Sequence, residues 1–456
     1  MKLSALARGT DLVLRGPDRD LPLKIKVDSR QMKKGEGFVA LRGANVDGHR
    51  FIPDVLAVGA SVVVCETASF QEDWQTRYPE CTFILSPVRC ERGLATLAQA
   101  YLEALPDLRD VIAITGSVGK TSTKNDTQVL LEKHFKLHTA GGNYNTLIGG
   151  AVTILAAPED TQIMLLEMGA NHNGEIAEMV RYFEPTVTAI TEIAPAHLES
   201  FHSLEGVLAA KTEILSSKKL RCAVINGDNA LLCERTKKFQ LPRVLRFGHR
   251  GDVTFSGERL RWEKGHFAVS AVLTGLDGIS FNFSLPLAGV HQLYPLSCAV
   301  AIAGLSGLKS QEIASELHRC RSVEGRGEIC HSENGAAILD ECYNASPAAM
   351  LASLEAIGSA GIPGRRFVVL GEMLELGEAS ARLHERVLKR ALQVSDELYL
   401  FGTEWSKVKE AEPFIFDDLE ELISEVDNSS PGEGDVILVK GSRGNHLERV
   451  VKALEL

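Results

Sequence analysis

The most constraining feature of this chain is an apolar segment that runs into a glycine-bracketed turn and then into the start of a helix. Residues 111–115 read VIAIT and residues 116–124 read GSVGKTSTK. Two glycines allow the backbone to curl until successive N–H groups face one point, and the following helix adds its positive end. The pattern predicts a phosphate-binding loop, and therefore ATP or GTP as the energy source.

Within this loop we expect Lys120 to reach terminal phosphates and the Thr121 hydroxyl to ligate Mg²⁺. The full set of expected nucleotide contacts is Gly116, Ser117, Gly119, Lys120, Thr121 and Ser122. The general consensus G-x-x-x-x-G-K-[ST] has a glycine where this chain has Ile114, so the loop takes the shorter form G-x-x-G-K-T. The alternative is an ordinary strand-to-helix turn with a capping threonine, but the patterns on both sides favour the phosphate loop.

Composition limits the class of protein. The 456 residues exceed the length at which one hydrophobic core keeps growing, so two or three domains are expected. An excess of acidic residues, 60 against 49 basic ones, gives no electrostatic case for binding nucleic acid or an anionic membrane surface. Nine cysteines without a C-x-x-C pair indicate free thiols in a reducing cytosol. Because the chain has neither a signal-peptide core nor an apolar run of membrane-spanning length, we expect a soluble cytoplasmic protein.

Beyond residue 105, short apolar runs alternate with helical patterns, which is typical of a parallel sheet covered by helices. The runs occupy residues 163–166, 187–190, 222–225, 336–339, 367–370 and 436–439. Residues 244–287 instead carry glycine and polar breaks between short strand-like pieces. That stretch suggests an antiparallel insertion with a structural role.

Two boundaries follow from these patterns. A helical repeat of leucines stops at Pro106, just before the phosphate-loop strand, and the turn Gly325-Arg326-Gly327 precedes the last group of strands. We therefore predict an α/β chain of three domains. These are a small N-terminal α/β domain (1–105), a central P-loop ATPase-like domain with a mostly parallel sheet (106–322), and a C-terminal Rossmann-like α/β domain (323–456).

Polar residues stand at the ends of several predicted strands, namely Glu167, Glu192, Asp340, Glu372 and Lys440. In open parallel sheets ligands bind outside the carboxyl ends of the strands, so these residues indicate a nucleotide site shared between two domains. Glu167 is a candidate Mg²⁺ ligand. Any single one of them could instead be a solvated strand end. His197 also follows a strand, and Lys211, taken alone, would be a surface lysine on an amphipathic helix.

Longer motifs along nearly the whole chain resemble the Mur ligase family. They are Asp28-Ser29-Arg30 and Asp47-Gly48-His49 near the N-terminus, the short phosphate loop, residues 167–176 and 196–214, and residues 340–347, 370–384 and 439–443 near the C-terminus. The resemblance also accounts for the missing first glycine, because the family loop has the same short form.

The resemblance implies an ATP-dependent amide ligase of peptidoglycan precursor synthesis, expected to be a cytoplasmic monomer without a nucleic-acid partner or a membrane span. ATP would phosphorylate the carboxylate of UDP-N-acetylmuramoyl-tripeptide. The amine of D-alanyl-D-alanine would then attack the acyl phosphate, and inorganic phosphate would leave.

The resemblance also implies roles for individual residues. Lys120, His197 and Lys211 would be catalytic, and Mg²⁺ would be held by Thr121, Glu167, His197 and Lys211, the last as a carbamate. Arg326 would contact ATP phosphates and Asp340 the ribose. Substrate contacts would come from Ser29, Arg30, Asp47, Gly48, His49, Asn143, Asn145, Tyr343, Asn344, Lys440 and Arg443.

Two segments depart from the family pattern. Gln292 and Pro295 stand where relatives usually carry the two asparagines of an H-N-x-x-N-A pattern, and Thr146 and Leu147 stand where another asparagine and an acid are common. Two alternatives stay open on other grounds. The sister ligase that adds the third amino acid shares the UDP-binding opening but usually has a D-N-P-type motif, which residues 340–347 lack. The second alternative is a P-loop NTPase of another class. It would not explain the polar strand end at residues 440–443, and the N-K-x-D motif that binds guanine is absent from the sequence.

Overall fold

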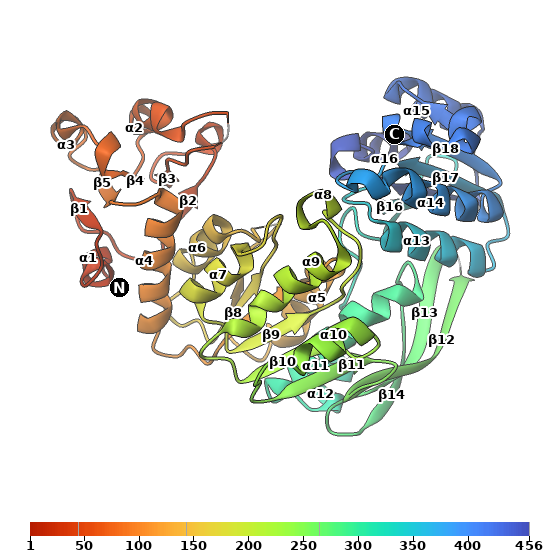
Figure 1. The fold of residues 1–456 in the computed structure, drawn as a ribbon, viewed down its shortest axis with the longest axis horizontal. Coiled ribbons are helices and arrows are strands. Elements are labelled where there is room, and N and C mark those ends of the chain that lie inside the picture. The colour runs from red at the N-terminus through yellow and green to blue at the C-terminus, as the bar shows by residue number, and fades with distance from the viewer. Residues whose placement is uncertain (44, 143, 264, 456) are drawn as a thin grey trace.

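The computed structural model describes residues 1–43, 45–142, 144–263 and 265–455, and it contains three α/β bodies in a row (Figure 1). Each body is built on its own sheet, of five, nine and six strands in chain order. The predicted α/β class with a mostly parallel central sheet is confirmed. Within the described ranges, no helix is long and apolar enough to cross a membrane.

The N-terminal body pairs its strands in the order β1-β5-β4-β3-β2, all parallel except β1, which runs antiparallel to β5. The strands are β1 (Val13–Arg15), β2 (Ile25–Lys26), β3 (Gly37–Val39), β4 (Val62–Glu66) and β5 (Thr82–Ser86), and the helices are α1 (Leu3–Ala7), α2 (Ile52–Val58), α3 (Glu72–Arg77) and α4 (Cys90–Ala104). The apolar stripe of α4 packs on α6 (Leu147–Leu155) of the central body (Figure 1). There the buried Tyr101 hydroxyl donates to the Ala157 carbonyl (2.7 Å).

The central sheet has the order β14-β13-β12-β11-β10-β9-β6-β8-β7. Its strands are β6 (Asp110–Thr115), β7 (Leu137–Thr139), β8 (Ile163–Glu167), β9 (Val187–Ile190), β10 (Cys222–Asn226), β11 (Val244–Gly248), β12 (Val253–Glu263), β13 (His266–Thr274) and β14 (Ser280–Leu285). The other helices are α5 (Lys120–Leu131), α7 (Glu175–Phe183), α8 (Leu198–Phe201), α9 (Leu204–Thr212), α10 (Ala230–Thr236), α11 (Leu293–Leu305) and α12 (Ser310–Leu317). Strand β6 is buried along its whole length between β8 and β9, so the phosphate loop emerges in the middle of the parallel part of the sheet.

The segment predicted as an antiparallel insertion is only partly of that kind. Strand β11 pairs parallel to both β10 and β12 and thus extends the parallel sheet. Only the pairs β12–β13 and β13–β14 are antiparallel, and they continue the same sheet. The prediction of an antiparallel insertion is therefore wrong for β11. The short apolar run of β11 directly precedes the antiparallel hairpins, so the sequence does not separate it from them. The β12–β13 hairpin reaches the C-terminal body (Figure 1).

The C-terminal sheet has the order β15-β16-β20-β17-β18-β19 and is parallel except for β15. Its strands are β15 (Glu328–His331), β16 (Ala337–Glu341), β17 (Arg366–Gly371), β18 (Glu397–Phe401), β19 (Ile415–Phe416) and β20 (Val436–Lys440), and its helices are α13 (Pro347–Ser359), α14 (Ser380–Val394), α15 (Leu419–Asn428) and α16 (Glu448–Glu455). Helices on both faces bury two separate apolar clusters.

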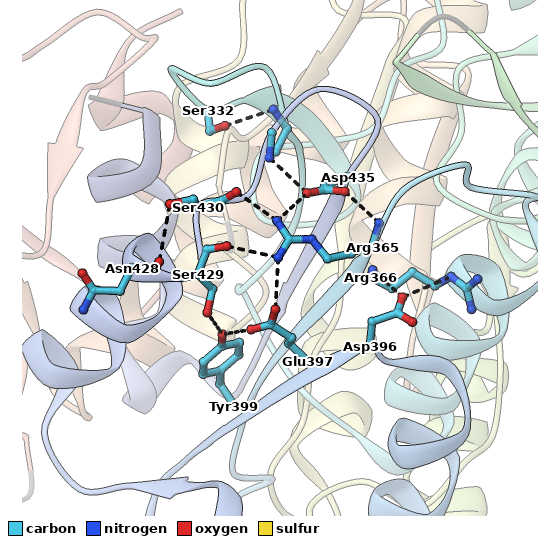
Figure 2. A network of polar contacts seen from close by, with 12 residues as sticks. Ser332, Arg365, Arg366, Asp396, Glu397, Tyr399, Asn428, Ser429, Ser430 and Asp435 are labelled. Atoms are coloured by element: carbon cyan, nitrogen blue, oxygen red, sulfur yellow. Dashed lines mark hydrogen bonds and ion pairs between the residues drawn. The ribbon is translucent and has the colours of Figure 1, made fainter.

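Figure 2 shows a polar network at the edge of this sheet where β17, β18 and β20 begin. The Arg365 guanidinium donates to Glu397 (3.3 Å) and to the Asp435 carboxylate (3.1 Å), and the Arg365 backbone N–H also donates to Asp435 (2.7 Å). Carbonyl oxygens of Ser429 and Ser430 accept from the same guanidinium. The network ties three strand starts together on the edge opposite to the one where ligands bind in such sheets.

Candidate active site

The backbone of the phosphate loop takes a conformation that glycine adopts most readily. Gly116 and Gly119 have φ angles of 147° and 83°. A β-carbon on Gly116 would stand 2.0 Å from the Thr191 hydroxyl oxygen, so a side chain there would collide with the end of β9. Thr191 Oγ1 in turn donates to the Val118 carbonyl (2.5 Å), which fixes the loop against that strand. The shape of the loop therefore requires both glycines.

Lys120 begins α5 and folds back over the loop, where its Nζ donates to the Gly116 carbonyl (2.7 Å). Burial lowers the pKa of Lys120; the negative charge of Glu167 opposes this shift, and the positive charge of Arg326 adds to it. Burial also lowers the pKa of Lys124, where the Glu167 charge again opposes the shift and the Arg326 charge adds to it. The cations of Lys120, Lys124 and Arg326 thus surround the single carboxylate of Glu167. This excess of positive charge suits a polyanionic ligand.

Glu167 ends β8 beside the loop and is held by two neutral donors. Thr121 Oγ1 donates to its Oε2 (2.8 Å), and Asn145 Nδ2 donates to its Oε1 (3.2 Å). A hydroxyl and a carboxylate next to a phosphate loop are the oxygen ligands that suit Mg²⁺, which usually shares its shell with phosphates. In the described part of the chain, no group of three or more His, Cys, Asp or Glu side chains could hold a metal by itself. The predicted contact Asn143 lies outside the described residues.

A second polar group supports the loop from behind. The Ser117 N–H donates to the Glu192 carbonyl (2.8 Å), just after β9. The Glu192 carboxylate accepts from Asn226 Nδ2 (2.8 Å), at the end of β10, and from Asn229 Nδ2. Burial raises the pKa of Glu192 against the effect of these donors. Sequence reasoning identified Glu192 as a strand end but missed both asparagines, although Asn226 directly follows a predicted strand.

Lys211 lies inside the protein, with 2% of the residue exposed. Its Nζ donates to the Ala170 carbonyl (3.3 Å) and lies 5.5 Å from the centroid of the Phe201 ring. Burial, together with the charge of Lys120, lowers the pKa of Lys211 to about 7. The interpretation of Lys211 as a surface lysine is wrong, because it shares the inward face of α9 with the fully buried Val207.

His197 follows β9 and meets the C-terminal body. Its Nδ1 donates to the Glu375 carboxylate, and the Glu199 N–H donates to the Glu375 carbonyl (3.1 Å). Burial lowers the pKa of His197, and the Glu375 charge opposes the shift. Because Nδ1 is engaged by Glu375, a ligand would meet the Nε2 atom.

On the N-terminal body, Ser29 and Arg30 lie in a short helical turn that Asp28 caps. The Arg30 Nε and NH2 groups donate to the two carboxylate oxygens of Asp28 at 3.0 and 2.8 Å. The Arg30 side chain is 88% exposed. The Arg30 guanidinium is therefore exposed to solvent, and its orientation is fixed by Asp28.

The second predicted group on this body is centred on His49. Its Nδ1 donates to Asp47 (2.6 Å) and its Nε2 accepts from the Glu66 N–H (3.1 Å), so the orientation of the ring is fixed. A β-carbon on Gly48 would stand 2.6 Å from the Leu41 carbonyl oxygen, which explains a glycine here. The side chain of Asp47 remains at the surface.

In the C-terminal body, Asp340 and Lys440 lie on the adjacent parallel strands β16 and β20. Lys440 Nζ donates to Glu341 Oε2 (2.7 Å), and both side chains are 6% exposed. Asp340 Oδ1 accepts from the Cys342 N–H (3.0 Å). Lys440 therefore forms a buried ion pair with Glu341 and is not a free cation at the carboxyl edge of the sheet.

Four further predicted residues lie close together at the carboxyl edge of this sheet. The Cζ atoms of Arg326 and Arg443 lie 3.9 and 5.8 Å from the centroid of the Tyr343 ring. Asn344 is exposed next to them, and its Oδ1 accepts from the Ala345 N–H (2.8 Å). The predicted residues therefore form local groups on all three bodies, and the groups around Lys120 and Arg326 influence one another electrostatically.

A glycine-bracketed loop over a buried parallel strand, with an opposing carboxylate and flanking α/β bodies, defines a P-loop α/β protein. Three family profiles match it: "Mur ligase family, catalytic domain" at residues 24–102, "Mur ligase middle domain" at residues 114–303, and "Mur ligase, glutamate ligase domain" at residues 325–443. The UDP-N-acetylmuramoyl-tripeptide–D-alanyl-D-alanine ligase of Rickettsia prowazekii is 30% identical, with 94% of each chain covered. The Escherichia coli protein of the same name is also 30% identical, with 99% of this chain and 98% of that one covered. The chain belongs to the Mur ligase family.

Solved structures give the same picture. MurF from Acinetobacter baumannii has a TM-score of 0.86 at 26% identity, covering 99% of this chain and 98% of that one. The MurF ligase from Thermotoga maritima in complex with ADP has a TM-score of 0.82 at 29% identity, covering 96% and 98%.

Proposed function

We propose that this chain is an ATP-dependent ligase that joins D-alanyl-D-alanine to UDP-N-acetylmuramoyl-tripeptide in peptidoglycan precursor synthesis. The observation that carries the proposal is similarity over nearly the full length, because a relative named for this reaction is matched over 94% of both chains. A solved structure of a similar MurF ligase holds ADP, and the cation-rich phosphate loop of this chain is physically suited to ATP.

The reaction has two steps. The γ-phosphoryl group of ATP passes to the tripeptide carboxylate, which gives ADP and an acyl phosphate. The dipeptide amine then forms the C–N bond while the C–O bond to phosphate breaks, and inorganic phosphate and a proton leave. Such transfers depend on positioning and on charge stabilisation, so the residues around the loop carry most of the catalysis.

In the first step the loop N–H groups cradle the phosphates, and Lys120 exchanges its loop carbonyl partner for a phosphate oxygen. Arg326 stabilises the transferring group from the C-terminal side. Thr121 and Glu167 are proposed to hold Mg²⁺, which offsets phosphate charge when bound. Asp340 is proposed to contact the ribose.

Lys211 is proposed to carry CO₂ as a carbamate. A pKa of about 7 leaves much of the amine neutral at physiological pH, and only the neutral amine can attack CO₂. The carbamate would turn a repelled cation into an oxygen ligand for Mg²⁺ beside His197.

Lys211→Ala should be inactive and partly rescued by a small carboxylate, and ¹³CO₂ should give a carbamate signal in the wild type alone. An unmodified lysine in high-resolution density with ATP and Mg²⁺ bound would contradict this role.

The UDP part of the substrate is proposed to bind the N-terminal body through Ser29, Arg30, Asp47, Gly48 and His49. Asn143, Asn145, Tyr343, Asn344, Lys440 and Arg443 are proposed to contact the peptide parts or the reacting phosphate. We assign these tasks to domains at residues 1–105, 106–322 and 323–456. We also propose a monomer in the cytoplasm, where ATP and nucleotide-linked precursors are made.

The test is phosphate release from ATP by the purified protein. Release is expected only when Mg²⁺, UDP-N-acetylmuramoyl-tripeptide and D-alanyl-D-alanine are all present, because the second step needs both acyl phosphate and amine. Equal turnover with ATP alone would overturn the proposal in favour of another class of P-loop NTPase. Turnover with the UDP-dipeptide and a single amino acid would instead assign the sister ligase.

A further inference from the structure

The topology of the C-terminal sheet brings three residues from distant parts of the chain to one point. Strand β16 lies between β15 and β20. Tyr343 follows the end of β16, and Arg443 follows the end of the parallel β20. Arg326 precedes the start of β15, which runs antiparallel to β16. All three therefore lie at the carboxyl edge of the sheet.

The backbone fixes the contact between Arg326 and Tyr343. The Tyr343 N–H donates to the Gly325 carbonyl (3.1 Å), and the Gly327 N–H donates to the Asp340 carbonyl (2.8 Å). Gly325 has a φ of 69°, and a β-carbon on it would stand 3.1 Å from the Tyr343 β-carbon. The chain on both sides of Arg326 is thus joined to the segment that carries the tyrosine.

The side-chain contact is a cation–π stack. The Arg326 Cζ lies 3.9 Å from the Tyr343 ring centroid, and Arg443 approaches the same ring at 5.8 Å. Arg443 also has a distant carboxylate partner in Glu448 (3.7 Å). For Arg326, no ion pair or side-chain hydrogen bond is found among the described residues.

A guanidinium that stacks through its face keeps its N–H donors free, because they lie in the plane of the group. The Tyr343 ring therefore holds Arg326 without occupying a donor. A carboxylate partner would hold it too, but would neutralise the charge that an incoming phosphate needs. The Tyr343 hydroxyl has no partner among the described residues, so the ring makes the contacts seen here.

We propose that Tyr343 is a positioning residue whose ring holds the Arg326 guanidinium ready to meet the transferring phosphoryl group. The inference rests on the proposed ligase function. It assigns the aromatic ring, rather than the hydroxyl, as the feature that this position requires.

The experiment compares Tyr343→Phe with Tyr343→Leu in the complete ligase assay with varied ATP. The phenylalanine variant keeps the ring, so its loss in kcat/KM for ATP should be clearly smaller than that of the leucine variant, because cation–π attraction needs only the ring face. The leucine variant should lose about tenfold in kcat/KM for ATP, as expected for an interaction of this strength. The loss in the leucine variant should be larger in the KM for ATP than in the KM for the UDP substrate.

Tyr182→Leu is the matched control, because it removes another arginine–tyrosine stack, with Arg181 at 4.9 Å, on helix α7. Its kinetics should equal those of the wild type. Thermal unfolding of all three variants separates lost stability from lost positioning.

Each outcome has one meaning. Equal losses in Tyr343→Phe and Tyr343→Leu would assign the hydroxyl to substrate contact and overturn the inference. Wild-type kinetics in Tyr343→Leu would also overturn it. A wild-type protein without ligase turnover would refute the proposed function itself, a result that is independent of the variants.

Discussion

Lys120 and the glycines beside it have separable tasks in the phosphate loop. The shape of the loop depends on Gly116 and Gly119, whereas the Lys120 side chain only caps a loop carbonyl until phosphate arrives. We expect Lys120→Ala to lower kcat by at least about a hundredfold, the scale of losing one charge-stabilising donor. Its melting temperature should stay close to that of the wild type, as measured by thermal unfolding alongside phosphate release.

Gly116→Ala provides the comparison for two reasons. Its new methyl group would collide with the Thr191 hydroxyl, and the positive φ angle at this position is strained for a residue with a side chain. That variant should lose stability as well as activity. A melting temperature for Lys120→Ala as low as that of Gly116→Ala would contradict the division of tasks.

Asp126 on α5 is a buried acid that the proposed mechanism does not use. Burial raises its pKa to about 7, while a hydrogen bond from the Cys320 thiol opposes the rise. Because the folded pKa lies above the unfolded value of 3.8, the native state binds more protons between those pH values. The free energy of unfolding should therefore fall as pH rises from about 4 to about 7 through this group, by at most about 1.4 kcal/mol per pH unit.

Asp126→Asn removes the titration but keeps the shape of the side chain. Urea unfolding should find this variant more stable than the wild type at pH 8, with the difference shrinking toward pH 5. A difference that is constant over this range would show that Asp126 does not titrate there.

Among the elements, the β12–β13 hairpin joins the central body to the C-terminal one. Phe267 is fully buried within the C-terminal apolar cluster, and its ring lies 5.0 Å from that of Trp262. The Trp262 N–H donates to the Ala360 carbonyl (2.9 Å) after α13. Nearer the base of the hairpin, the ladder breaks between Ser256 and Arg259. The tip thus belongs to the C-terminal core, although its strands belong to the central sheet.

Phe267→Ala should cost about 3–5 kcal/mol of stability, the usual range for emptying a core site. It should also widen the distribution of distances between the two bodies in solution scattering, because it removes an apolar anchor between them. Phe283→Ala on β14 is the control, since Phe283 packs on the central core alone. Equal widening in both variants would contradict an anchoring role for the tip.

The sequence predicts elements well where burial alone decides the pattern. Strands β8, β9, β10, β16, β17 and β20 lie where apolar runs of four residues predict them. Strand β18 was not predicted, because its residues ELYLF begin with an acid and merge with the preceding helical pattern. The phosphate loop and Glu167 are local signals and are found together as expected. Burial of Lys211 and the Lys440–Glu341 pair arises from packing between distant segments, so spacing along the chain does not specify them.

At the scale of the whole molecule, the central and C-terminal bodies meet through a few polar contacts as well as the hairpin. His197 donates to Glu375, and Gln292 Nε2 donates to the Arg326 carbonyl (3.3 Å). Gln292, which departs from the family pattern, thereby contacts the segment that enters the C-terminal body. Small contacts of this kind permit relative motion of domains.

Asp340→Ala tests the two-body nucleotide site. If the C-terminal edge contributes to binding ATP, this variant should raise the KM for ATP without changing the affinity for the UDP substrate. Titration calorimetry with the UDP-tripeptide alone measures that affinity. Weaker binding of the UDP-tripeptide would contradict the separation of the two sites.

We expect the C-terminal body to close onto the phosphate loop when the ligands bind. Lys120, Lys124 and Arg326 repel one another around a single carboxylate, so the cations favour the approach of the two bodies only when an anion lies between them. Adding an ATP analogue with UDP-N-acetylmuramoyl-tripeptide should therefore reduce the radius of gyration in solution scattering, and the Lys120→Ala protein should contract less. Closure in this order would exclude water from the acyl phosphate only once the substrates are bound. Identical dimensions with and without both ligands would mean that the bodies catalyse the reaction in the arrangement of Figure 1.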